Sequence, residues 1–232
     1  MKKTILIVFL FSFFLTNAVA EEDERQKLLG DSVSVVEEIM NSPDQEIPAN
    51  LISQAKAILI FPTMVKAGFF LGGRHGKGVA SIRSKSTGEF GPPTFLTQSG
   101  ISFGFQIGAE AIDLILLVMT ERGLKSLLKD EFTLGADVAV STGPVGRHAE
   151  AAVDIRMQGE IYSYSRSKGA FAGVSLNGTV ITTAEDDNHI YYGQPFKAKD
   201  ILLRGKVKKL PESGRRFIKE LNTIAPGKRK RK

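Results

Sequence analysis

The stretch that most constrains the fold covers residues 58–80, where glycine recurs between apolar runs of strand length. It contains five glycines together with Arg74, His75 and Lys77. Glycine inside a strand permits a bulge or the close approach of another backbone. We therefore predict that this stretch forms a strand, a basic glycine-rich turn and a second strand.

Similar glycine-rich or alternating patterns recur over residues 100–108, 141–147 and 163–174. Asn177-Gly178 is a strong two-residue turn signal, which predicts that residues 170–176 and 179–183 pair as a hairpin. The predicted strands outnumber the helices that could cross between them. This favours an α+β fold with a largely antiparallel, strongly curved sheet of about eight strands and short flanking helices.

Residues 24–41 predict an amphipathic helix, because Leu29, Val33, Val36 and Met40 follow the helical period. Its polar face is acidic, which argues against binding to a membrane by this helix alone. We expect its apolar stripe to pack on the sheet. Shorter helices are predicted near residues 48–55, 121–130, 186–192, 197–204 and 211–221.

The first twenty residues combine a basic start, an apolar run and the sequence Ala18-Val19-Ala20. This pattern predicts a secretory signal peptide over residues 1–20, cleaved after Ala20. We therefore expect an exported, periplasmic protein that can associate peripherally with a membrane. A single domain over residues 21–225 would precede a basic tail over residues 226–232.

The net charge of +6 comes from the two ends of the chain. Residues 21–227 hold 24 Lys and Arg against 25 Asp and Glu, so the predicted domain is close to neutral. A nucleic-acid-binding domain needs a basic face, and we expect no nucleic-acid partner. Residues 228–232 are all basic. They can be a solvated end, or can adhere to anionic lipid head groups.

The sequence offers few groups for catalysis or for metal binding. It has three histidines, no cysteine and no H-E-x-x-H motif, so we expect no metal site and no cofactor. Residues 100–104 match G-x-S-x-G, but the alternation continues past Ser102, which favours a strand over a nucleophile elbow. A serine esterase using Ser102 stays one alternative function, and a structural envelope or interaction protein stays another.

Five cationic side chains lie in glycine- or serine-rich segments: Arg74, Lys77, Arg147, Arg166 and Lys168. Backbone N–H groups in such turns can surround an anion, and a nearby cation can complete a phosphate site. These residues form a lipid-phosphate site if the turns meet at one end of the sheet. Otherwise they are solvated charges on ordinary hairpin turns.

Several motifs, in order over residues 28–205, resemble the SYLF-domain family. They lie at residues 60–62, 66–69, 72–73, 76–79, 104–108, 134–137, 143–147, 164–174 and 191–193. The resemblance implies a non-enzymatic domain that binds phospholipids, phosphoinositides in eukaryotic members, through an amphipathic N-terminal segment and basic surface positions. Some eukaryotic members also bind actin, a partner that we do not expect for a chain exported from a bacterium.

We therefore predict a protein that is not an enzyme and that binds anionic or phosphate-bearing phospholipid at a membrane surface. The five cations above are the predicted head-group contacts. The oligomeric state is left open.

Overall fold

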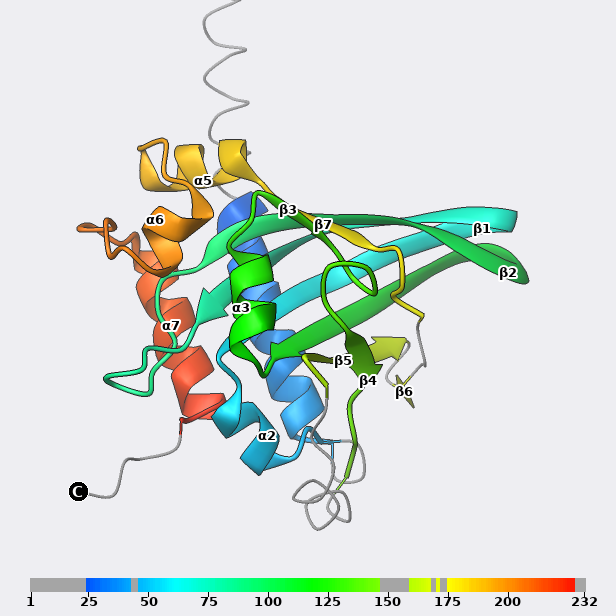
Figure 1. Ribbon diagram of the computed structural model, residues 1–232, viewed down its shortest axis with the longest axis horizontal. Coiled ribbons are helices and arrows are strands. Elements are labelled where there is room, and N and C mark those ends of the chain that lie inside the picture. The colour runs from blue at the N-terminus through cyan, green and yellow to red at the C-terminus, as the bar shows by residue number, and fades with distance from the viewer. Residues whose placement is uncertain (1–23, 43–45, 147–158, 168–169, 172–174, 228–232) are drawn as a thin grey trace, which may run out of the picture.

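The computed structural model describes residues 24–42, 46–146, 159–167, 170–171 and 175–227, which form a curved sheet with helices on both sides (Figure 1). Among these residues the sheet has seven strands in the order β3-β7-β2-β5-β4, with β1 paired to β2 and β6 paired to β5. Among the pairings of these described strands, only that of β4 with β5 is parallel. The predicted α+β class, with a largely antiparallel and curved sheet, is confirmed.

The strands are β1 (Ala57–Ile82), β2 (Thr94–Val118), β3 (Glu131–Thr133), β4 (Val140–Thr142), β5 (Ile161–Ser167), β6 (Ala170–Phe171) and β7 (Val180–Thr183). The helices are one over residues 24–40, α2 (Ala49–Gln54), α3 (Glu121–Leu127), α5 (Glu185–Tyr192), α6 (Ala198–Leu202) and α7 (Glu212–Ile224). Each helix expected from the sequence is present within a few residues of its predicted bounds. None of the helices that the described residues form combines the length and apolar character needed to cross a bilayer.

β1 and β2 form one long antiparallel ribbon, from Ala57 opposite Val118 to Ala80 opposite Thr94. The predicted glycine-rich turn within residues 66–78 is wrong, because this segment is strand and pairs with residues 96–110 of β2. Residues 94–118 likewise form a single strand, which extends well beyond the alternating pattern at residues 100–108. The facing strand supplies backbone partners along the segment, so the glycines remain extended apart from bulges.

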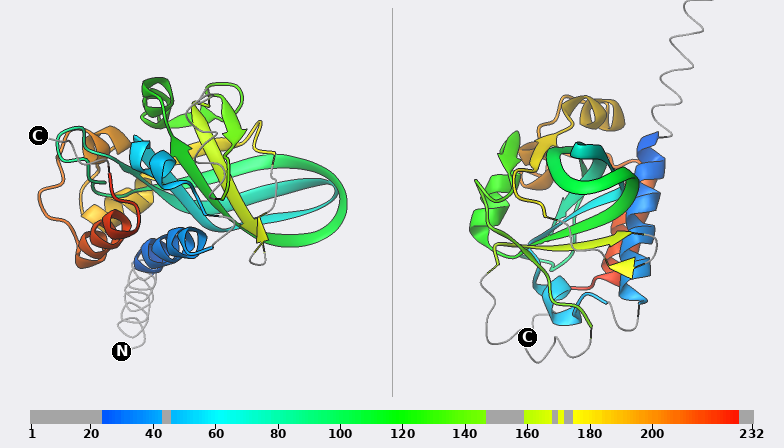
Figure 2. Two further views of the ribbon diagram at one scale, coloured as in Figure 1. Left: turned by 90° about the horizontal axis from the view of Figure 1, so that it is seen from below. Right: turned by 90° about the vertical axis from the view of Figure 1, so that its right-hand side faces the viewer.

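The ribbon bends back on itself, as the left view of Figure 2 shows. The Arg83 backbone N–H donates to the carbonyl of Lys56 at 2.7 Å, which joins the end of β1 to the residue before its start. A Cβ on Gly78 would lie 2.5 Å from the Ile60 carbonyl oxygen and 2.7 Å from Cε1 of Phe61. The glycine therefore lets the two limbs of β1 pack at close range.

The ribbon's alternating side chains enter two cores, one on each face of the sheet. Ile58 and Ile60 join the core that contains the N-terminal helix, α2, α5 and α7. Leu59 and Phe61 join the core that contains α3, β3 and β7. The right view of Figure 2 shows the sheet between α3 on one side and the N-terminal helix with α7 on the other. A strand buried on both faces reads as a continuous apolar run, as residues 57–61 do.

The N-terminal helix packs as its period predicts. Leu29, Val33 and Val36 are buried in the first core, and Met40 packs against it. The predicted hairpin around Asn177-Gly178 is wrong in its pairing. Gly178 takes the left-handed conformation of a turn, with φ at 76°, but the described part of β6 pairs with β5, and β7 pairs with β2 and β3. Because β7 pairs with β2 along one edge and with β3 along the other, it has no edge left for the residues that precede the turn.

Candidate functional site

A polar pocket of about 490 Å³ lies where the loop between β1 and β2 meets α2 and the start of α3. Its lining consists of Ser53, Gln54, Lys56, Arg83, Lys85, Ser86, Thr87, Gly88, Met119, Thr120 and Gly159. The charged members of this lining are three cations, and four others carry hydroxyl groups. The lining can therefore donate many hydrogen bonds to an anion.

Arg83 fixes the geometry of the pocket wall. Its guanidinium donates to the backbone carbonyls of Ala55 and Ile52 at 3.1 Å, of Gly88 at 2.8 Å and of Ala225 at 3.0 Å. It also lies 3.8 Å from the ring centroid of Phe90, within cation–π range. Burial lowers the pKa of Arg83 to about 10, so the group remains charged at neutral pH. It ties the loop, α2 and the end of α7 together.

Lys56 and Lys85 are held less firmly. Their Nζ atoms lie 3.1 Å and 2.9 Å from the same Glu121 carboxylate oxygen. Hydrogen bonds from Lys85 and Lys56 lower the pKa of Glu121. All three side chains are partly exposed, with 33%, 77% and 51% of their surface open to solvent. Exposed ion pairs of this kind contribute at most about 1 kcal/mol each, so both lysines can exchange partners.

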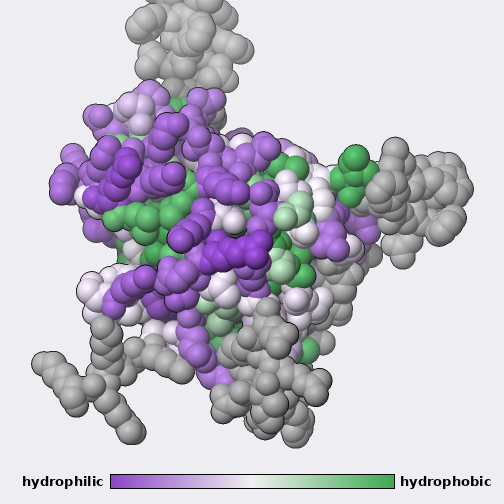
Figure 3. Space-filling view, in the orientation of Figure 1, coloured by the Kyte–Doolittle hydropathy of each residue, from purple (hydrophilic) through white to green (hydrophobic). Residues whose placement is uncertain are grey.

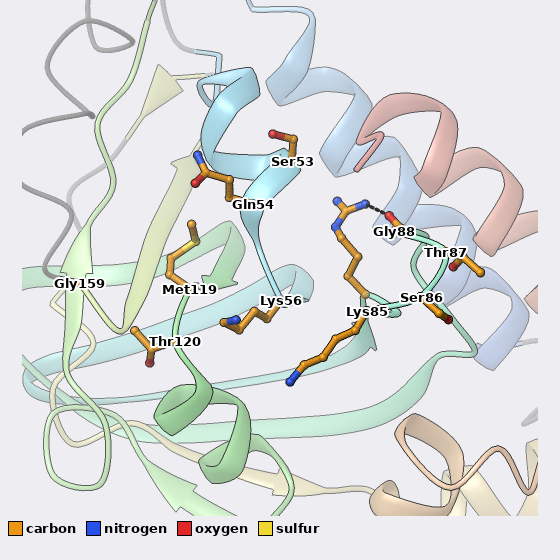
Figure 4. A pocket seen from close by; sticks show the side chains of 11 residues that line it. Ser53, Gln54, Lys56, Lys85, Ser86, Thr87, Gly88, Met119, Thr120 and Gly159 are labelled. Atoms are coloured by element: carbon orange, nitrogen blue, oxygen red, sulfur yellow. Dashed lines mark hydrogen bonds between the residues drawn. The ribbon is translucent and has the colours of Figure 1, made fainter. Parts of the chain in front are cut away.

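Figure 4 shows the side chains of Lys56 and Lys85 reaching from different segments toward the start of α3. Met119 and Thr120 close the pocket on that side. On the face drawn in Figure 3, hydrophilic side chains cover most of the described surface and surround a smaller hydrophobic area. The three cations and four hydroxyl-bearing residues of its lining suit the pocket to a polar, negatively charged group better than to an apolar one.

The structure places Arg74 inside the protein. Its side chain is only 6% exposed, and it donates to the carbonyl of Ile101 at 3.0 Å and to that of Ser175. Burial lowers its pKa. Gly100, opposite Arg74 in the ribbon, leaves room for the guanidinium, since a Cβ there would lie 2.9 Å from Nε. These contacts favour a structural role for this residue.

Lys77 and Arg166 lie at different ends of the N-terminal helix. Lys77 is 47% exposed and lies 3.6 Å from Glu24 and from Asp187. Arg166 is 11% exposed and pairs with Glu38, and with Asp113 at 3.1 Å. At 1.5 Å per helical residue, Glu24 and Glu38 are about 20 Å apart. The described members of the predicted cation set therefore do not form one site. Arg147 and Lys168 lie outside the described residues.

Ser102 lies within β2, opposite Gly72, and the strand continues to Val118. A nucleophile elbow needs a sharp turn from strand to helix at the serine. That geometry is absent at this position, which agrees with the prediction that Ser102 is a strand residue.

Sequence reasoning missed the pocket because its lining comes from several segments far apart in the chain. Residues 85–88 have the composition of an ordinary polar turn, and Lys56 is an isolated cation before an apolar run. One signal was present: Arg83 and Lys85 both lie at the start of the loop that joins β1 to β2. Only the bend of the ribbon, which brings Lys56 beside Arg83, shows that the three cations share one hollow.

Comparison with known proteins gives consistent matches. The model of the family described as "Ysc84: Las17-binding protein actin regulator" matches residues 99–224. SH3 domain-containing YSC84-like protein 1 of Homo sapiens is 33% identical over 188 residues, covering 81% of this chain and 54% of the human protein. LAS seventeen-binding protein 3 of Saccharomyces cerevisiae (strain ATCC 204508 / S288c) is 37% identical over 171 residues, covering 72% of this chain and 37% of the yeast protein.

The chain thus spans about half the length of the human relative and less of the yeast one. The names of the family and of these relatives describe binding proteins and an actin regulator, and they name no enzymatic activity. The family match covers more than half of the chain, and the wider alignments include the glycine-rich motifs that suggested the resemblance. The chain therefore belongs to the Ysc84 family, whose shared domain is the SYLF domain.

Proposed function

We propose that this chain binds the phosphate group of anionic phospholipids at a membrane surface, without catalysis, and that the pocket around Lys56 and Lys85 makes the head-group contacts. The observation that supports the proposal is the charge of that pocket. Three cations line it, and Glu121 at its edge is the carboxylate to which the two lysines are paired. A lysine ammonium is a compact donor that suits phosphate oxygens.

The different environments of the three pocket cations support the same function. Arg83 is committed to four carbonyls and holds the loop in place, so it positions Lys85 rather than contacting the ligand. Lys56 and Lys85 are exposed enough to reach a ligand. Each lysine near an anionic surface contributes about 1 kcal/mol at low salt, which gives about thirtyfold in affinity for two.

The residues predicted from the sequence keep a secondary place in this proposal. Lys77, with half of its side chain exposed, can add to a cationic surface if its carboxylate partners release it. Arg147, Lys168 and the tail at residues 228–232 stay proposed contacts. Arg74 and Arg166 are engaged within the protein, and their proposed contribution is to the fold around the site.

The test is co-sedimentation of residues 21–232, which include every described residue, with phosphatidylcholine vesicles that contain or lack phosphatidic acid. We expect Lys56→Gln/Lys85→Gln to weaken binding tenfold or more at low salt. The matched control is Lys208→Gln/Lys209→Gln, which removes the same charge from an exposed loop after α6. Equal losses in the two double variants would show nonspecific attraction and refute the pocket as the site.

A second candidate function, a protein-interaction domain, is favoured by the description of the matching family as Las17-binding. Pelleting of residues 21–232 with actin filaments tests it. Co-pelleting would contradict our expectation that actin is not a partner, and its absence would agree with it.

We also propose that the chain is exported and loses residues 1–20, as the Ala18-Val19-Ala20 pattern indicates. Amino-terminal sequencing of protein recovered from a bacterial periplasm should begin at Glu21. Recovery of the chain with Met1 intact, in the cytoplasm, would refute this.

A further inference from the structure

Glu121 occupies a position that an anionic ligand would take. One of its carboxylate oxygens accepts from Lys56 at 3.1 Å and from Lys85 at 2.9 Å. The two lysines come from opposite ends of the bent ribbon and converge on this single oxygen. Two ammonium groups around one oxygen is also the arrangement that binds a phosphate oxygen.

The contact between Glu121 and the lysines is replaceable, unlike that of Arg83. About half of the Glu121 side chain is exposed, and Lys85 is more exposed still. Exposed pairs exchange at little cost, because water and other ions compete for both partners. By contrast, the four carbonyl contacts of Arg83 hold the pocket wall in place while Lys56 and Lys85 change partner.

We propose that Glu121 is an internal competitor for the anion, displaced when a phosphate group binds Lys56 and Lys85. The proposal rests on the proposed function, because it concerns the same pocket. An anion then binds only if it interacts with Lys56 and Lys85 more strongly than the Glu121 carboxylate does. A phosphodiester carries one negative charge and merely replaces the carboxylate, whereas a phosphomonoester carries about −1.5 to −2 near neutral pH and gains from the exchange. The pocket accordingly prefers a terminal phosphate to a bridging one.

A structural role for Glu121 makes the opposite prediction. If the carboxylate only positions the two lysines, removing its charge releases them and weakens binding. If it competes with the ligand, removing its charge strengthens binding. The sign of the effect therefore distinguishes the two roles.

The experiment compares Glu121→Gln with Glu89→Gln in residues 21–232. Glu89 is an exposed carboxylate on the loop that also carries Lys85, so both variants change the net charge equally. The primary probe is inorganic phosphate, titrated by NMR at fixed pH and ionic strength. We expect Glu121→Gln to bind phosphate about two- to fivefold more tightly than Glu89→Gln. Equal or weaker binding by Glu121→Gln overturns the proposal.

Vesicles identify the source of the phosphate group. If lipid supplies it, Glu121→Gln should also increase sedimentation with phosphatidic acid vesicles more than with phosphatidylglycerol vesicles of equal charge density. If phosphate binding improves while neither lipid is bound by any form of the protein, Glu121 competes with a free phosphate and the proposed lipid function fails. If the wild-type protein binds both vesicle types but Glu121→Gln matches Glu89→Gln with every probe, the lipid function stands and the competitor role is refuted.

Discussion

Substitution of glycines along β1 tests whether the ribbon is bent as described. Gly73, Gly76 and Gly78 lie in one strand, and none has a positive φ, so alanine changes the space available without imposing backbone strain. A Cβ on Gly73 meets nothing within 4 Å. On Gly76 it lies 3.2 Å from the Met64 Cα. On Gly78 it lies 2.5 Å from the Ile60 carbonyl oxygen and 2.7 Å from Cε1 of Phe61.

The expected destabilisation follows this order. Gly73→Ala should change the free energy of unfolding by less than about 1 kcal/mol, and can stabilise the protein by restricting the unfolded chain. Gly76→Ala should cost about 1 kcal/mol, since a small shift relieves its contact. Gly78→Ala collides with backbone as well as with a buried ring, which places it at or above the upper end of overpacking costs, about 3 kcal/mol.

Urea unfolding of the three variants measures these differences. With a slope of about 2–3 kcal/mol/M for a domain of this size, a loss of 3 kcal/mol lowers the midpoint by roughly 1–1.5 M. The corresponding drop in Tm is about 6–12 °C. If Gly78→Ala is as stable as Gly73→Ala, the two limbs of β1 are not in contact and the bent ribbon is incorrect.

Two further predictions concern the second half of the chain. Asn188 is fully buried; its side chain accepts hydrogen bonds from Phe95 N and Thr94 Oγ1 and donates to the carbonyls of Ala184 and Phe95. Because Asn188→Leu leaves these groups unpaired, it should lower the free energy of unfolding in urea by about 3 kcal/mol. A loss below about 1 kcal/mol would contradict this. Hydrogen bonds from Lys206 and Arg204 lower the pKa of Asp200 to about 2, so its stabilising contribution is present above about pH 4 and is lost as the pH falls towards 2. Unfolding of Asp200→Asn should therefore depend less on pH across this interval than unfolding of the wild type, and parallel curves would argue against the ion cluster.

Local pattern was sufficient to predict most elements of this fold. The stripe from Leu29 to Met40 predicts both a helix and its buried face, because a helical period depends only on neighbouring turns. The alternation around Phe103 likewise predicts a strand. The bend of the ribbon could not be predicted, since the contact of Gly78 with Ile60 and Phe61 depends on a backbone path that neither end of the segment reveals.

The candidate site was less predictable for the same reason. Five cations were selected by their glycine-rich surroundings, but Arg74 is buried and Arg166 pairs with carboxylates on the N-terminal helix and on β2. Glycine marks close approach of chains as well as anion-binding turns, and at Gly100 it makes room for the Arg74 side chain. Lys56 and Lys85 had no distinctive neighbours, and their shared partner Glu121 lies on a third segment.

The bent ribbon also has a consequence for the order of folding. Paired residues at its closed end, Ala80 and Thr94, are 14 residues apart, whereas Ala57 and Val118 are 61 apart. Loop-closure entropy makes the distant pair costlier to form first by roughly 1.3 kcal/mol. Strand pairing should therefore nucleate beside residues 83–93 and spread outward, with the contact between Lys56 and Arg83 completed late. Before that contact forms, the apolar faces of a long two-stranded sheet are open to solvent, and in this interval the chain is most prone to aggregate.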